Sequence, residues 1–214
     1  MNASQPNIQG RRETLEVAYL AERARIASLS GDSSAPDGDF EHPVFGAGDV
    51  FARALIIGEA PGGEEAACGM PFVGKAGKQL GALLGSIALD RNDVYITNVV
   101  KYRPVVRGAR TVRNRTPIKG EVAGALPLLE LELNTIAPSV VVTLGNTPLY
   151  AVTALFGGAQ STIGALHGRP RQLRATGEAP ALFPLYHPAS GIYNRSLVPV
   201  MEADIRALAA FLAK

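Results

Sequence analysis

The sequence contains a single cysteine, Cys68, in 214 residues. One thiol excludes a disulfide within the chain and any metal site built from several thiolates. The sequence neighbours of Cys68 are alanine and glycine, and no base lies near it along the chain. We therefore interpret Cys68 as an incidental residue rather than a nucleophile, and we predict no metal site.

Long apolar runs are also absent. No uninterrupted apolar stretch approaches the roughly 20 residues that span a bilayer. The opening stretch, MNASQPNIQGRR, is polar and lacks the apolar segment of a secretory signal. We expect a soluble, cytoplasmic protein with no membrane partner. Nothing in the sequence indicates an oligomer, so we expect a monomer.

Acidic residues are missing between Val94 and Gly120, where seven of the 21 basic residues lie. A run of charge can be no more than a solvated face of the protein. The density of positive charge in this stretch also fits a nucleic-acid phosphate backbone. The residues that we predict to contact DNA here are Arg103, Arg107, Arg110, Arg113 and Arg115.

The chain divides into an N-terminal segment, residues 1–40, and a single α/β domain, residues 41–214. The first segment combines a helix over residues 11–30, which contain no glycine or proline, with a flexible connector, SGDSSAPDGD. In the second, short β-branched or aliphatic runs at 53–57, 93–100, 139–144 and 181–186 alternate with helical stripes of apolar residues. This alternation predicts a three-layer α/β/α sandwich around a central, mainly parallel four-stranded sheet.

Polar residues follow the predicted strands at the edge where strand-to-helix loops converge. Glu59 follows the first strand, and it could be a turn carboxylate or could stabilise positive charge. Asn98 ends the second strand, where its amide needs partners from a structural network or from a ligand. His187 closes the fourth strand, immediately before a proline. Phe72 could be ordinary core or a platform on which a base stacks.

Three motifs resemble those of the family 4 uracil-DNA glycosylases. Gly-Glu-Ala-Pro-Gly at 58–62, followed by Gly-x-Pro-Phe-Val-Gly-x-Ala-Gly at 69–77, resembles the first motif of that family. Tyr-His-Pro-Ala at 186–189 resembles the second, and VYITNVVKYRP with NRTP resembles the intervening strand and loop. The likeness runs in order from about Val44 to the C-terminus. The chain is thus similar to enzymes that remove uracil from DNA in base excision repair.

The resemblance implies a role for each candidate residue. Phe72 stacks on a flipped-out uracil, and Asn98 pairs with its Watson–Crick edge. His187 contacts the O2 carbonyl, and Glu59 lies by the sugar and the attacking water, so these two are the implied catalytic residues. The implied wall of the base pocket includes Gly58 and Ala60. The loop after His187 implies a wedge that fills the gap left by the base; its candidates are Ile192, Tyr193 and Arg195.

One departure concerns the iron–sulfur cluster that family 4 members ordinarily hold through four cysteines. Two of those positions correspond to Tyr102 and Ala125, and the other pair falls near residues 27–29, which are Ala, Ser and Leu. With Cys68 the only thiol, a cluster with four cysteine ligands is excluded, and we predict no cofactor. We expect Tyr102 and residues near 27–29 to fill the space by packing.

A second departure is the loop at 105–114, which is longer than usual in the family and carries three arginines. The resulting hypothesis is a monofunctional uracil-DNA glycosylase whose partner is uracil-containing DNA. Two alternatives stay open. One is a glycosylase for another deaminated base such as hypoxanthine, and the other is a protein that binds damaged DNA without cleaving it.

Overall fold

The computed structural model describes residues 8–174 and 179–213. The first seven residues of the predicted N-terminal segment lie outside this range. The longer helices are α1 (Ile8–Ser28), α3 (Lys75–Gly85), α4 (Lys119–Ile136), α5 (Asn146–Leu155) and α8 (Val198–Leu212). The short helices are α2 (Gly63–Cys68), α6 (Ile163–Leu166) and α7 (Ala189–Tyr193), with 3₁₀ turns at Leu29–Gly31, Arg91–Asp93 and Arg195–Leu197.

The central sheet has the strand order β2-β4-β3-β7-β9-β8. Its four inner strands are β3 (Ala54–Gly58), β4 (Tyr95–Asn98), β7 (Val140–Leu144) and β9 (Ala181–Leu185), and they pair in parallel. These are the four predicted strands. The prediction of a four-stranded sheet is wrong in its count, because β2 (Ala47–Gly48) and β8 (Arg171–Gln172) add antiparallel edges. Strands of two residues are too short to carry a hydrophobic pattern.

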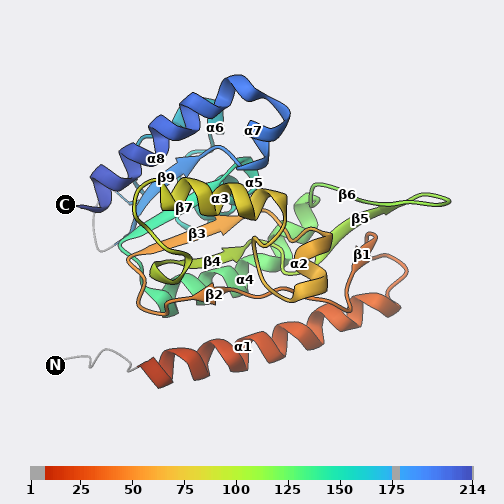
Figure 1. Cartoon of the computed structure of the whole chain (residues 1–214). Coiled ribbons are helices and arrows are strands. Elements are labelled where there is room, and N and C mark those ends of the chain that lie inside the picture. The colour runs from red at the N-terminus through yellow and green to blue at the C-terminus, as the bar shows by residue number, and fades with distance from the viewer. Residues whose placement is uncertain (1–7, 175–178, 214) are drawn as a thin grey trace.

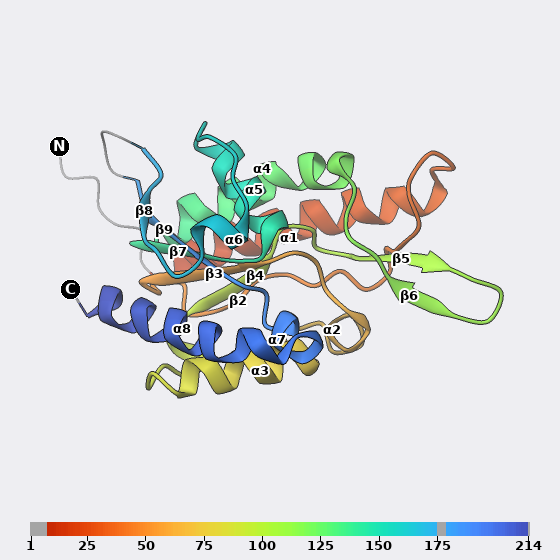
Figure 2. The same cartoon turned by 90° about the horizontal axis from the view of Figure 1, so that it is seen from above.

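Alternate residues of the inner strands pack into two separate cores, which makes the sandwich three-layered. Leu55 and Ile57 point into the core shared with α1, α4 and α5. Ile56, between them, points into the core shared with α3 and α8. Figure 2 shows α3 and α8 on one side of the sheet and α1, α4 and α5 on the other. Burial on both faces explains why the strand sequences show no clean alternation of apolar and polar residues.

Helix α1 lies along the outer side of α4 (Figure 1). The buried Arg11 Nη1 donates to the carbonyl oxygens of Val50, at 2.9 Å, and Ile136, at 2.7 Å. Tyr19 Oη donates to Glu132 Oε1 of α4 at 2.7 Å. The N-terminal helix is therefore attached to the α/β layers by buried polar contacts as well as by packing.

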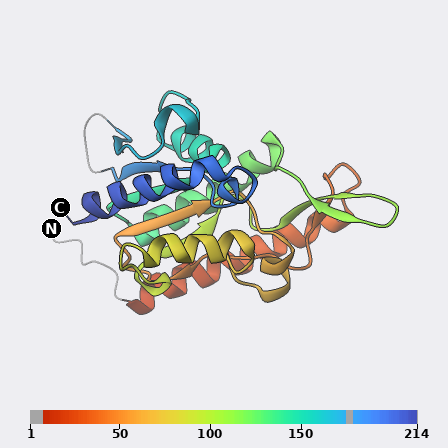
Figure 3. The ribbon, with the colours of Figure 1, turned by 45° about the horizontal axis from the view of Figure 1, so that its top comes forward.

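A β-hairpin formed by β5 (Arg103–Arg107) and β6 (Val112–Asn114) projects from the body of the molecule (Figures 1 and 3). With β1 (Gly38–Asp39) it forms a second, three-stranded sheet. The hairpin contains the long loop at 105–114, so this loop is a regular ribbon rather than irregular chain. Within the described residues, no helix is both long and apolar enough to cross a membrane.

Candidate functional site

An open cleft of about 640 Å³ lies at the carboxyl edge of the parallel strands. The chain leaves β3 for β4 on one side and later returns to place β7 on the other side of β3. This reversal of strand order makes the loops diverge, which opens a crevice at that edge of an α/β sheet. The predicted residues that line the cleft are Ala60, Phe72, Asn98, Arg103, His187, Ile192 and Tyr193.

The Phe72 ring and the Asn98 side chain meet above Gly58, the last residue of β3. A β-carbon added at Gly58 would collide with Asn98 Oδ1 and with Cζ of Phe72. Only glycine therefore fits there without displacing the two side chains. Phe72 and Asn98 are both buried, but each borders the cleft. Gly58 thus makes room for two predicted side chains, Phe72 and Asn98, that line the cleft.

Two charged side chains, for which the sequence predicted no role, bind the backbone of the loop that carries Phe72. The buried Glu65 carboxylate accepts hydrogen bonds from the backbone N–H groups of Gly62, Val73 and Gly74, at 3.1, 3.2 and 2.8 Å. The Arg91 guanidinium donates to the carbonyl oxygens of Pro71 and Phe72. These contacts support the left-handed backbone of Phe72, whose φ of 54° is uncommon for a side chain of this size.

His187 forms the wall of the cleft that faces Phe72, with ring centroids 6.1 Å apart. The backbone N–H of Ala189 donates to His187 Nδ1 at 3.2 Å. Burial lowers the pKa of His187, and the more distant Glu65 carboxylate only partly opposes this effect. The ring is therefore neutral at physiological pH. Since Nδ1 accepts a hydrogen bond, the proton lies on Nε2, which can donate.

Glu59 lies in a neighbouring hollow of about 470 Å³, which also contains Tyr186 and His187. Three residues, Ala60, Asn114 and His187, line both this hollow and the cleft. Thr147 Oγ1 donates to Glu59 Oε2 at 2.5 Å. A carboxylate and a neutral imidazole, brought from the loops after β3 and β9, therefore border one space.

The predicted DNA-contacting arginines fall into three groups. Arg103 lines the cleft and its Nε donates to Asn114 Oδ1 at 2.7 Å. Arg107, Arg110 and Arg113 are exposed on the hairpin, outside the lining of the cleft. The Arg115 guanidinium is bound to both oxygens of Glu121, at 2.5 and 2.8 Å, and to three backbone carbonyls, of Asp37, Val105 and Thr116.

The wedge candidates lie after His187, on α7 and the turn that follows it. Ile192 and Tyr193 line the rim of the cleft, and Tyr193 is 89% exposed. Arg195 is exposed but does not line the cleft.

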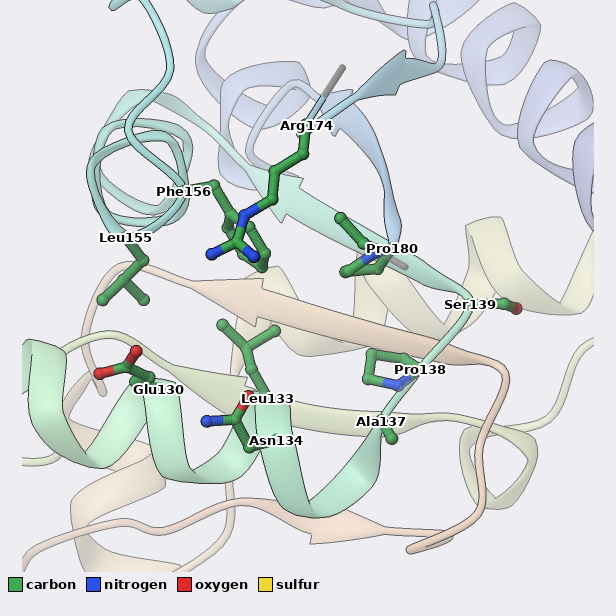
Figure 4. A pocket seen from close by; sticks show the side chains of 11 residues that line it. Glu130, Leu133, Asn134, Ala137, Pro138, Ser139, Leu155, Phe156, Arg174 and Pro180 are labelled. Carbon is green, nitrogen blue, oxygen red and sulfur yellow. The ribbon is translucent and has the colours of Figure 1, made fainter. Parts of the chain in front are cut away.

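A separate cavity of about 530 Å³ lies at the opposite edge of the sheet, beside the residues that precede β7 and β9. Figure 4 shows Arg174 and Phe156 on one side of it and Leu133 of α4 on another. The Arg174 guanidinium lies 5.5 Å from the centre of the Phe156 ring. None of the predicted site residues lines this cavity.

Comparison with known proteins places the chain in a family. Its sequence matches the uracil DNA glycosylase superfamily over residues 45–210. The chain belongs to that superfamily. Type-4 uracil-DNA glycosylases from Saccharolobus solfataricus and Archaeoglobus fulgidus are each 36% identical to it, over 78% and 79% of this chain and 74% and 81% of their own lengths. The Thermotoga maritima type-4 enzyme is 35% identical over 80% of this chain and 83% of its own length.

The cysteine-ligated cluster implied by the resemblance to family 4 of the superfamily does not fit this donor set. Cys68 is exposed at the end of α2, and the described residues contain no group of three His, Cys, Asp or Glu side chains able to hold a metal. Tyr102 and Ala125 are buried in one core, against which Leu29 packs. Tyr102 Oη donates to Glu121 Oε1 at 2.7 Å, and Phe40 packs edge-on against the Tyr102 ring.

Asn114 and Thr147 also belong to the lining of the two hollows, although no role was predicted for either residue. In the sequence, Asn114 is only the first residue of the NRTP motif. In the structure it is the last residue of β6, and the hairpin places it where it lines both hollows. Thr147 is the second residue of α5, which follows β7, and its partner, Glu59, lies 88 residues earlier in the chain.

Proposed function

We propose that this protein hydrolyses the N-glycosidic bond of uracil in DNA after flipping the nucleotide out of the helix. The observation that carries the proposal is the shared border of the two hollows. Phe72, Asn98 and His187 surround a space that fits a nucleobase, and Glu59 lies beyond His187 in the adjoining space. Flipping costs a few kcal/mol and is easiest for a mispaired base such as uracil opposite guanine.

Recognition of uracil follows from the order of donors and acceptors. We propose that Phe72 stacks on the base while Asn98 donates to O4 and accepts from N3–H. Cytosine presents an amino donor in place of O4 and an acceptor in place of N3–H. The Asn98 amide would therefore face a donor with its own donor and an acceptor with its own acceptor. Gly58 leaves room for the Phe72 ring and the Asn98 side chain that would contact the base, and Ala60 lines both hollows, between the base and the sugar.

Bond cleavage separates charge, and each charge has a partner in the site. As the C1′–N1 bond breaks, its electron pair leaves with uracil, and positive charge develops on the deoxyribose. The neutral His187 donates from Nε2 to O2, where the negative charge accumulates. The Glu59 carboxylate stabilises the sugar and orients water, whose oxygen bonds to C1′. The proton that water loses balances the proton that uracil finally takes up.

The DNA itself is bound outside the cleft. We propose that the hairpin arginines, with Arg103 at its base, follow the phosphate backbone. Arg115 then acts by anchoring the hairpin through Glu121, since its five donors are already used. Ile192 and Tyr193, at the rim, are the side chains placed to enter the DNA stack, with Arg195 contacting a phosphate nearby.

We further propose a monomeric cytoplasmic enzyme, with a catalytic domain at 41–214 and an appended N-terminal segment at 1–40. We also propose that it works without an iron–sulfur cluster, because it has only one cysteine and that residue is exposed. Tyr102, Ala125 and Leu29 would then fill the space of the cluster by packing.

Incubation with an oligonucleotide panel tests the function. Duplexes carrying uracil, hypoxanthine or thymine are treated with the protein and then with alkali, which cuts the strand wherever a base has been removed. Cutting at uracil supports the proposal. Cutting only at hypoxanthine would indicate a glycosylase for a different deaminated base. Tight binding with no cut in any duplex would indicate a damage-binding protein instead.

The hairpin has its own prediction. Replacing both Arg110 and Arg113 with alanine should weaken DNA binding equally for uracil-containing and normal duplexes, because phosphate contacts carry no sequence information. The slope of log K against log salt should fall by about 1 for each arginine removed. Arg12→Ala, an exposed change on the distant α1, is the matched control. An unchanged slope in the double variant would exclude the hairpin from the DNA path.

A further inference from the structure

The Glu59 carboxylate has one direct side-chain partner among the described residues, and it comes from a different loop. Thr147 Oγ1 donates to Glu59 Oε2 at 2.5 Å. Glu59 follows β3, and Thr147 is the second residue of α5, after the adjacent strand β7. Both side chains are half-buried and line the same hollow as His187.

The position of the Thr147 hydroxyl is fixed by the backbone around it. Gly145, which precedes α5, has a φ of 93°, a conformation that other residues rarely adopt. Its N–H donates to the carbonyl oxygen of Leu185, at 2.9 Å, which ties the start of α5 to the end of β9. Asn146 Oδ1 accepts from the backbone N–H of Ile163 at 2.8 Å, which ties the same turn to α6.

A threonine hydroxyl has one hydrogen, and in this structure it points at a single carboxylate oxygen. Oε2 is thereby held, and Oε1 is left for a water or the sugar. Without this bond, the carboxylate could rotate about its terminal torsion, which has a broad and shallow energy profile. A misplaced carboxylate affects the transition state more than the binding of the flipped base, which contacts other residues.

We infer that Thr147 is a positioning residue that orients Glu59 for the glycosidic cleavage; this inference rests on the proposed function. Thr147 is not itself a catalytic residue, because it reaches the reacting atoms only through Glu59. The alternative is that the bond simply joins two loops. The two roles predict different results for a Thr147 variant. They differ in whether the loss of the hydroxyl lowers kcat, and in whether that loss adds to the effect of a Glu59 variant.

The test uses Thr147→Val, which keeps the shape of the side chain and removes the hydroxyl. We expect kcat for uracil release to fall by about 10- to 100-fold, the usual effect of losing a hydrogen bond to a charged group. KM should change little, and so should the affinity for an oligonucleotide carrying 2′-fluoro-2′-deoxyuridine, which resists cleavage. Thr147→Ser keeps the hydroxyl and should restore most of kcat. Thr153→Val, on the same helix but outside both hollows, is the control.

A double-mutant cycle with Glu59→Gln separates the two roles. If Thr147 acts through Glu59, Thr147→Val should have little further effect once the carboxylate is gone. Fully additive losses, or a Thr147→Val enzyme with wild-type kcat, would overturn the inference. Those outcomes leave the proposed function intact, because the wild-type protein still releases uracil. A wild-type protein that releases no base would instead overturn the proposed function first.

Discussion

Replacing His187 with alanine is expected to lower kcat for uracil release by about 10²–10³-fold, the usual effect of removing one preorganised donor from a developing negative charge. The donor is already set before substrate binds. The Ala189 N–H holds Nδ1, and burial lowers the pKa of the ring, so a neutral imidazole presents Nε2–H to the cleft. A water molecule in the space left by the ring would have to be reoriented during the reaction.

Single-turnover cleavage of a uracil-containing duplex measures this effect, and thermal unfolding provides the check on folding. His187 is half-buried in a loop, so the His187→Ala protein should keep a Tm close to that of wild type. His42→Ala is the matched control, because His42 is exposed shortly after β1 and lines neither hollow. Wild-type turnover in the His187→Ala protein would remove this residue from the mechanism.

The four parallel strands could be predicted because each is a short run of mainly aliphatic, aromatic or β-branched residues buried on both faces. Ala54 to Gly58 are all buried, as are Val140 to Leu144. The edge strands could not, because β2 and β8 consist of two residues each and are defined by their partners. The hairpin was hidden for a related reason: the pairing of Val106 with Arg113 depends on a turn whose sequence, GART, carries no strong hairpin signal.

The part of the site that could be predicted consists of residues at the ends of the parallel strands or directly after them. The rule that loops converge at the carboxyl edge of a parallel sheet was enough to select Glu59, Asn98 and His187. It could not supply the partners that hold them. Glu65 and Arg91 bind backbone atoms of the Phe72 loop, and these contacts exist only once that loop is folded. In the sequence Arg115 is one of several basic residues in a run, whereas in the structure its guanidinium pairs with Glu121. Such contacts join residues that lie apart in the sequence, and they depend on how the fold brings these residues together.

A buried ion pair behind Asn98 gives the largest expected effect on stability. Lys101 and Glu132 side chains are both 0% exposed, and Lys101 Nζ lies 2.7 Å from Glu132 Oε2. Nζ also donates to Thr97 Oγ1 at 2.7 Å and to the carbonyl oxygen of Asn98 at 2.5 Å. Burial lowers the pKa of Lys101, and the Glu132 carboxylate opposes that shift. The ammonium group therefore depends on its three acceptors to stay charged.

Lys101→Met should lower the free energy of unfolding by about 3–5 kcal/mol, because it leaves the Glu132 carboxylate buried without its cation. For a chain of this size that corresponds to a fall in Tm of roughly 6–20 °C. The double variant Lys101→Met/Glu132→Leu should be more stable than Lys101→Met alone, since no unpaired charge remains. Urea unfolding measures all three proteins, with the exposed Lys78→Met as the control.

The two variants also separate the role of the pair in stability from its role at the site. Both lose the Nζ contact to the Asn98 carbonyl, but only Lys101→Met leaves a buried charge. If the pair matters for folding alone, the double variant should regain activity as it regains stability. If the contact also holds Asn98 in place, the double variant should recover its Tm and still discriminate uracil from cytosine less well than wild type. A Lys101→Met protein with wild-type stability would show that Glu132 finds another proton or partner, and the pair would then have no role in stability.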